Sequence, residues 1–148
     1  MFLTLPSELL PPRLAALRLI EEDSLPSILI VDDYPAVRSA IRAGLERYSG
    51  FLVCGEAVDG ADAIEKATKL KPDFILLDLS MPRMNGMEAA SILKRLMPNV
   101  FIVAFSMYAE LLGRSLPSTL GIDAVIDKLA GIEKVVECAR NLLGVAAT

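Results

Sequence analysis

The chain of 148 residues contains no histidine and only two cysteines. Without histidine, neither a Ser-His-Asp nor a Cys-His catalytic group can form, and no imidazole can bind a metal. Cys54 and Cys138 lie far apart and form no CxxC pair, so they match neither a zinc site nor a disulfide framework. Their apolar neighbours favour buried thiols in a reducing compartment. Any chemistry must therefore depend on carboxylates, hydroxyls and lysine.

The sequence also lacks a long apolar run and a dense basic cluster, although 53% of its residues are hydrophobic. No run approaches the ~18 residues that a membrane-spanning helix needs. Glu8 and several prolines stand where a signal peptide requires a basic flank and an apolar centre. A net charge of −4 argues against nucleic acid as a direct partner. We therefore expect one cytoplasmic domain that binds neither a membrane nor nucleic acid directly.

Two short apolar runs end in carboxylates. Residues 74–77 are apolar and are followed by Asp78, with a turn-forming segment after it. Residues 27–31 form a similar run that ends in Asp32 and Asp33. Continuous runs of this kind are typical of strands buried on both faces. Such a strand cannot hold an unpaired charge in its middle, because that costs several kcal/mol, but it can present one at its end.

Helical periodicity separates the predicted strands. Further strands are expected at residues 51–57, 100–105 and 123–126, and helices at 35–48, 61–70, 87–97, 108–116 and 132–143. Inward positions are expected at Ala63, Ile64, Ala67, Leu70, Ala90, Leu93, Leu96 and Met97. The strand–helix order repeats five times, which predicts an α/β fold with a doubly wound parallel sheet and helices on both faces.

Residues 1–25 differ from the rest of the chain because prolines punctuate them. Between the prolines, Leu14, Leu17 and Ile20 repeat at helical spacing, which favours a short amphipathic helix. A poorly ordered leader is the alternative, and a helix that docks on the domain or on a second copy also stays open. We expect an N-terminal extension at residues 1–25 and one domain at 26–148.

Five polar side chains are expected to converge at one edge of the sheet, because the carboxyl ends of parallel strands meet there. They are Asp32, Asp33, Asp78, Ser106 and Lys128. Three carboxylates close together repel one another, and a bound cation is a usual remedy. With oxygen ligands alone, Mg²⁺ is the natural cation. An ammonium and a hydroxyl complete a site suited to holding a phosphoryl group on a carboxylate, with an aspartyl phosphate as the simplest product.

Each of these residues also has a purely structural interpretation. The two adjacent acids suit a helix cap next to Pro35, Asp78 suits a solvated strand end, Lys128 an ordinary surface position, and Ser106 a loop hydroxyl. Their joint occurrence at corresponding strand ends favours the functional interpretation. A nucleotide-binding fold is a weak alternative, because no glycine-rich loop follows the first strand.

Four segments resemble the receiver domain of bacterial two-component response regulators. They are ILIVDD at 28–33, LDLSMPRMNG at 77–86, AFSMY at 104–108 and DK at 127–128. They occur in the family's order and spacing, and the resemblance covers residues 26–146. It implies the flavodoxin-like strand order 2-1-3-4-5. The AFSMY segment is similar to receivers that usually precede a helix-turn-helix DNA-binding domain.

The resemblance implies a role for each acid. Asp78 would be the phospho-acceptor, taking a phosphoryl group from a sensor histidine kinase in a Mg²⁺-dependent reaction. Asp33, Asp78 and the backbone carbonyl of Ser80 would bind Mg²⁺ directly, and Asp32 would act through water. The chain would then catalyse its own phosphorylation and dephosphorylation rather than a metabolic reaction.

The resemblance also implies that Ser106 is the switch hydroxyl and that Lys128 contacts the phosphate, so that the signal passes to an unidentified downstream protein. One departure stands out, since Val125 occupies a position where the family usually has Tyr or Phe. It favours an alternative in which the domain is a scaffold or a homodimerisation module that does not switch. The chain ends soon after the last expected helix, and both a stand-alone receiver and one joined to an output domain stay open.

Overall fold

A computed structural model describes residues 25–81, 84–110 and 120–145. Their centre is a five-stranded parallel sheet in the order β2-β1-β3-β4-β5. The strands are β1 (Ser27–Val31), β2 (Leu52–Ala57), β3 (Phe74–Leu77), β4 (Phe101–Ser106) and β5 (Ala124–Asp127). The predicted doubly wound fold and its strand order are confirmed.

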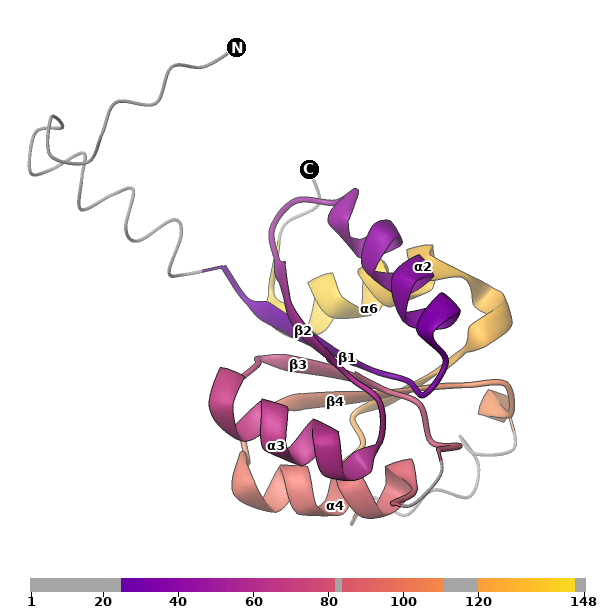
Figure 1. Cartoon of the computed structure of the whole chain (residues 1–148). Helices are drawn as coiled ribbons and strands as arrows, with labels where there is room; N and C mark the ends of the chain where they lie inside the picture. The colour runs from indigo at the N-terminus through magenta and orange to yellow at the C-terminus, as the bar shows by residue number, and fades with distance from the viewer. Residues whose placement is uncertain (1–24, 82–83, 111–119, 146–148) are drawn as a thin grey trace, which may run out of the picture.

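Helices cover both faces of this sheet (Figure 1). On one face lie α3 (Gly60–Leu70) and α4 (Gly86–Leu96), and on the other lie α2 (Pro35–Glu46) and α6 (Ile132–Leu143). A short 3-10 helix, η3 (Lys128–Ala130), follows β5 directly. The apolar side of the last helix packs as the sequence predicts, with Val135, Val136 and Ala139 buried.

The two faces of the sheet carry separate apolar cores. In β1, Ile28 and Ile30 belong to the core beneath α2 and α6, whereas Leu29 and Val31 belong to the core beneath α3 and α4. This alternation follows from the two-residue period of a strand, which turns successive side chains to opposite faces. β3 is buried at all four of its positions, as expected for a central strand between two helical layers.

Two apolar positions differ from the sequence prediction. Leu70 and Leu96 were expected to face inward, but their side chains are 43% and 56% exposed. Each is the last residue of its helix, beyond Ala67 and Leu93, where the buried positions of α3 and α4 end. Periodicity predicts the face of a helix well but not the residue at which it ends.

Two expected elements fall largely outside the described residues. They are the short helix within residues 1–25 and the weak helix at 108–116. Among the helices of the described residues, none is long and apolar enough to cross a membrane.

The dipeptides Asp59-Gly60 and Asn85-Gly86 are typical of turns, but here each begins a helix. The side chain of Asp59 accepts a hydrogen bond of 2.8 Å from the backbone N–H of Asp62 at the start of α3. The side chain of Asn85 accepts one of 2.9 Å from the N–H of Glu88 at the start of α4. Both satisfy backbone donors that have no partner within the helix, which fixes where each helix begins.

Gly86 lies where the start of α4 meets the end of β3. Its N–H donates a hydrogen bond of 3.1 Å to the carbonyl of Leu79. A Cβ at Gly86 would lie 2.5 Å from the Cα of Leu79 and closer still to the carbonyl oxygen of Asp78. These are backbone atoms, which cannot turn aside as a side chain can. Only glycine allows α4 to approach Asp78 this closely.

We therefore expect Gly86→Ala to lower the free energy of unfolding by about 2 kcal/mol, because the added methyl group forces backbone atoms apart. Chemical denaturation followed by circular dichroism measures this loss. Gly55→Ala is the matched control, since a Cβ there meets only the ends of two side chains, that of Leu70 at 2.8 Å and that of Leu29 at 3.6 Å. Equal losses in the two variants would show that the close approach at Gly86 has no special cost.

Candidate functional site

The register of the central strands brings the first acids together. Val31 of β1 pairs with Leu77 of β3. The residues that follow, Asp32 and Asp78, therefore leave the sheet side by side, and the N–H of Asp78 donates a hydrogen bond of 2.9 Å to the carbonyl of Val31. In this strand order, β1 and β3 are the neighbours at which the winding direction reverses.

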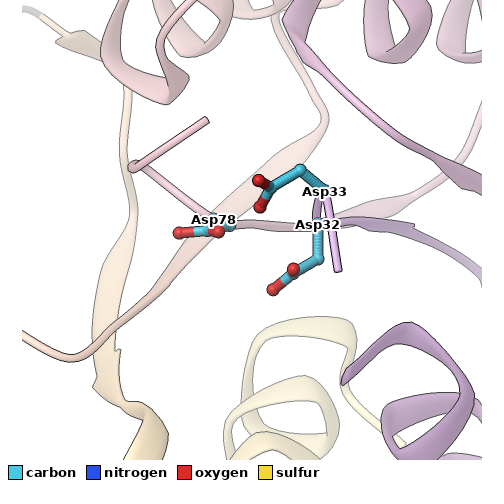
Figure 2. A group of neighbouring side chains, drawn as sticks. All are labelled: Asp32, Asp33 and Asp78. Carbon is cyan, nitrogen blue, oxygen red and sulfur yellow. The ribbon is translucent and has the colours of Figure 1, made fainter. Parts of the chain in front are cut away.

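Three carboxylates gather at this strand edge. Asp32, Asp33 and Asp78 each place an oxygen so that the three atoms lie within 4.8 Å of one another. Figure 2 shows that they come from two strand ends and meet in one place. Asp32 and Asp78 are buried, at 1% and 6% exposure, while Asp33 is half-buried.

Lys128, which directly follows β5, supplies the positive charge that faces these carboxylates. Its Nζ lies 2.9 Å from Oδ2 of Asp32 and 3.4 Å from Oδ2 of Asp78. It also lies 6.0 Å from the centre of the Phe105 ring, close enough for a cation–π contact. Asp127 begins η3 by accepting a hydrogen bond of 2.8 Å from the N–H of Leu129, which fixes the backbone at Lys128.

Burial and the neighbouring opposite charge shift the pKa of Asp78, and likewise that of Lys128, in opposite directions. Burial raises the pKa of Asp78, although the N–H of Ser80 and the charge of Lys128 partly offset it. For Lys128, burial is the largest effect and lowers the pKa, but the hydrogen bond to Asp32 and the charge of Asp78 outweigh it, so that the pKa is raised. Lys128 is therefore a permanent cation beside a carboxylate that is costly to ionise.

Asp33 differs from the other two acids. Its carboxylate has no hydrogen-bond or ion-pair partner among the described residues. Asp32 and Asp78, in contrast, accept from the N–H groups of Tyr34 and Ser80 at 2.9 and 3.0 Å. Three clustered carboxylates, one with uncommitted oxygens, form a donor set that suits a hard divalent cation. The residues present therefore fit such an ion.

The two serines of the sequence prediction lie beside this cluster. Ser106, at the end of β4, is buried, and its Oγ accepts a hydrogen bond of 3.0 Å from the N–H of Tyr108. It makes no hydrogen bond to Asp78 among the described residues. Ser80 is exposed and contacts Asp78 through its backbone N–H.

Sequence reasoning missed one contact at the site. Nη1 of Arg38, in α2, donates a hydrogen bond of 2.8 Å to the backbone carbonyl of Asp32. The same guanidinium pairs with Glu56 of β2, whose Oε1 lies 3.1 Å from Nε. No local signal links Arg38 to Glu56, because the two residues are 18 positions apart.

The model of the response regulator receiver domain family matches residues 28–140, which is most of the chain. The chain belongs to this family. Receiver domains act in two-component signalling, in which a kinase phosphorylates an aspartate of the domain. An acidic pocket of the kind seen at Asp32, Asp33 and Asp78 is typical of the family.

Individual receivers show the same likeness. The response regulator protein VraR of Staphylococcus saprophyticus is 41% identical over 116 residues, covering 77% of this chain and 54% of VraR. The chain thus spans about half the length of the curated relatives it matches.

Two solved structures show the likeness in three dimensions. The isolated receiver domain of RcsB from Salmonella enterica serovar Typhimurium, studied with the phosphomimetic BeF3⁻, has a TM-score of 0.71 at 26% identity, covering 83% of this chain and 91% of that one. A LuxR-family response regulator from Aurantimonas has a TM-score of 0.71 at 26% identity, covering 82% and 88%. The predicted resemblance to receiver domains is confirmed.

The raised pKa of Asp78 predicts how stability depends on pH. A buried acid with a raised pKa binds a proton more readily in the folded state, so folding loses free energy as the pH rises through that pKa. In the absence of divalent cations, Asp78→Asn should therefore raise the melting temperature at pH 7 by roughly 2–5 °C. The gain should shrink as the pH falls from the raised pKa of Asp78 to the ordinary carboxyl range, and it should vanish below that range. Differential scanning calorimetry across pH measures it.

The exposed acid Glu88 provides the control, because Glu88→Gln removes a charge without removing a buried one. It should leave the melting temperature nearly unchanged. An Asp78→Asn protein no more stable than the wild type at pH 7 would contradict the interpretation.

Proposed function

We propose that this receiver domain accepts a phosphoryl group on Asp78 from a partner histidine kinase. The observation that carries the proposal is the position of Asp78, which shares one strand edge with two further carboxylates and lies 3.4 Å from the Nζ of Lys128. A nucleophilic carboxylate needs a neighbouring positive charge and a fixed direction more than it needs covalent help from other groups. Both are present at Asp78.

The reaction is a transfer between two nucleophiles. A carboxylate oxygen of Asp78 attacks the phosphorus of the kinase phosphohistidine, a new P–O bond forms, and the P–N bond breaks as imidazole leaves. The product is an aspartyl phosphate. This chain cannot hold the group on a histidine itself, because it has none.

Asp33, Asp78 and the carbonyl of Ser80 would hold Mg²⁺ directly, and Asp32 would act through water. The ion would neutralise charge on the phosphoryl oxygens. The hydrogen bond of 3.0 Å from the N–H of Ser80 fixes the direction of the Asp78 carboxylate. Lys128 keeps its charge at neutral pH because Asp32 and Asp78 raise its pKa against the effect of burial, so it is available to bind a phosphoryl oxygen.

Ser106 would respond to the phosphoryl group on Asp78. Its hydroxyl now accepts from the N–H of Tyr108, and we propose that it turns toward the phosphoryl oxygen once Asp78 is modified. The segment after β4 would then take a second arrangement, which a downstream protein can recognise. Residues 26–148 would form the receiver and 1–25 an extension. The unpaired thiols of Cys54 and Cys138 support a cytoplasmic location.

The assignment of Asp78 is tested by phosphorylation with acetyl phosphate. Wild-type protein with Mg²⁺ should gain the mass of one phosphoryl group, and Asp78→Ala should gain none, because it lacks the attacking oxygen. Chelation of Mg²⁺ should reduce the wild-type yield at least about tenfold, since the acids then repel the incoming anion. Intact-protein mass spectrometry measures the yield.

Glu88→Gln serves as the control and should be phosphorylated like the wild type. An Asp78→Ala protein that is phosphorylated with undiminished yield would overturn the assignment. A wild-type yield that is unaffected by chelation would overturn the role of the cation.

A second candidate is a receiver that does not switch. Val125, in β5, is half-buried against the core beneath α3 and α4, and no aromatic ring stands there to move when Ser106 moves. The domain would then serve as a scaffold or as a dimerisation module.

The two candidates differ in their response to beryllofluoride with Mg²⁺. If Ser106 moves toward the phosphoryl position, the N–H of Tyr108 loses its acceptor and its hydrogen exchange should accelerate by roughly tenfold or more. The Asp78→Ala protein should show no change. Unaltered exchange at Tyr108, together with unaltered oligomeric mass, would favour the scaffold, whereas a mass that doubles without faster exchange would favour dimerisation alone.

A further inference from the structure

Arg38 connects the outer face of α2 with the acids of the site. Its side chain is only 14% exposed. Nη1 donates a hydrogen bond of 2.8 Å to the carbonyl of Asp32, and Nε donates one of 3.1 Å to Oε1 of Glu56. The guanidinium is planar, so these two bonds fix its orientation in a way that a single ammonium could not.

Glu56 has a second arginine partner. Nε of Arg42 donates a hydrogen bond of 2.7 Å to its second carboxylate oxygen, Oε2. This bond is the main reason that the pKa of Glu56 is lowered, so Glu56 stays ionised at neutral pH. Arg42 also pairs with Glu46 on its own helix at 3.2 Å. Arg38 therefore pairs with a carboxylate that stays ionised.

The carbonyl that Arg38 binds belongs to the peptide between Asp32 and Asp33. The rest of this peptide segment is also fixed, since the N–H of Asp32 donates to the carbonyl of Ala57 at 3.1 Å and the N–H of Tyr34 donates to Oδ1 of Asp32 at 2.9 Å. The Asp33 carboxylate alone has no partner among the described residues. Its direction depends on the backbone that carries it.

We propose that Arg38 is a positioning residue that sets the orientation of the Asp33 carboxylate toward a divalent cation. It acts through the Asp32 carbonyl and touches neither the ion nor the phosphoryl group. The inference rests on the proposed function, because it requires a cation between Asp33 and Asp78. Groups that orient metal ligands from outside contribute to affinity by fixing the ligands before the ion arrives.

Simple electrostatics predicts the opposite effect. Arg38 carries a positive charge near three carboxylates, so its removal should strengthen the binding of a cation if charge alone mattered. A positioning role predicts weaker binding when the same charge is removed. The sign of the change therefore separates the two explanations.

The experiment titrates Mn²⁺, as a probe of the site, into the full chain and follows free Mn²⁺ by electron paramagnetic resonance. Arg38→Met should raise the dissociation constant by about tenfold. Arg42→Met is the matched control, because it removes an equal charge from the same partner, Glu56, without touching the Asp32 carbonyl. Its dissociation constant should stay within about twofold of the wild type. Arg38→Lys, which keeps the charge and one donor group, should restore part of the affinity.

Circular dichroism confirms that each variant is folded before titration. Equal affinities for the wild type and Arg38→Met, or tighter binding by Arg38→Met, would overturn the positioning role. Equal weakening in Arg38→Met and Arg42→Met would also overturn it and indicate a general loss of structure. Failure of the proposed site has a different signature, because the wild type would then bind Mn²⁺ no better than Asp33→Asn or Asp78→Ala.

Discussion

Asp32, Asp78 and Lys128 form a charge cluster whose members would be unstable alone at the edge of a buried sheet. An isolated carboxylate in such a place would be protonated, and an isolated ammonium would lose its proton. In the cluster, Nζ of Lys128 lies 2.9 Å from Asp32 and 3.4 Å from Asp78, and this proximity stabilises the charged forms where water has little access. The nearby Asp33 adds a further negative charge, so the cluster holds more anions than cations.

Apolar strands that take no part in the chemistry position this cluster. β1 and β3 are buried on both faces, and their register is fixed by the two apolar cores. A slip by one residue would exchange the core residues of the two faces, so the register is strongly specified. The positions of Asp32 and Asp78 follow from that register rather than from any attraction between them.

Much of the fold and site could be predicted because the evidence is local or topological. Alternating strand and helix patterns predict a parallel sheet, and a parallel sheet brings residues such as Asp78 and Lys128 to one edge although 50 positions separate them. The contact of Arg38 with Glu56 could not be predicted in this way, because it depends on how α2 lies over β2. The exposure of Leu70 likewise depends on where α3 ends, which periodicity does not reveal.

The close approach at Gly86 has a mechanical consequence. The backbone of Asp78 and Leu79 touches the first residue of α4 directly, with a hydrogen bond of 3.1 Å and no side chain between them. A soft side chain at this junction would absorb a small displacement, but two backbone segments in contact transmit it. α4 is thus coupled directly to the backbone that follows β3, and a shift of that backbone would displace the whole helix.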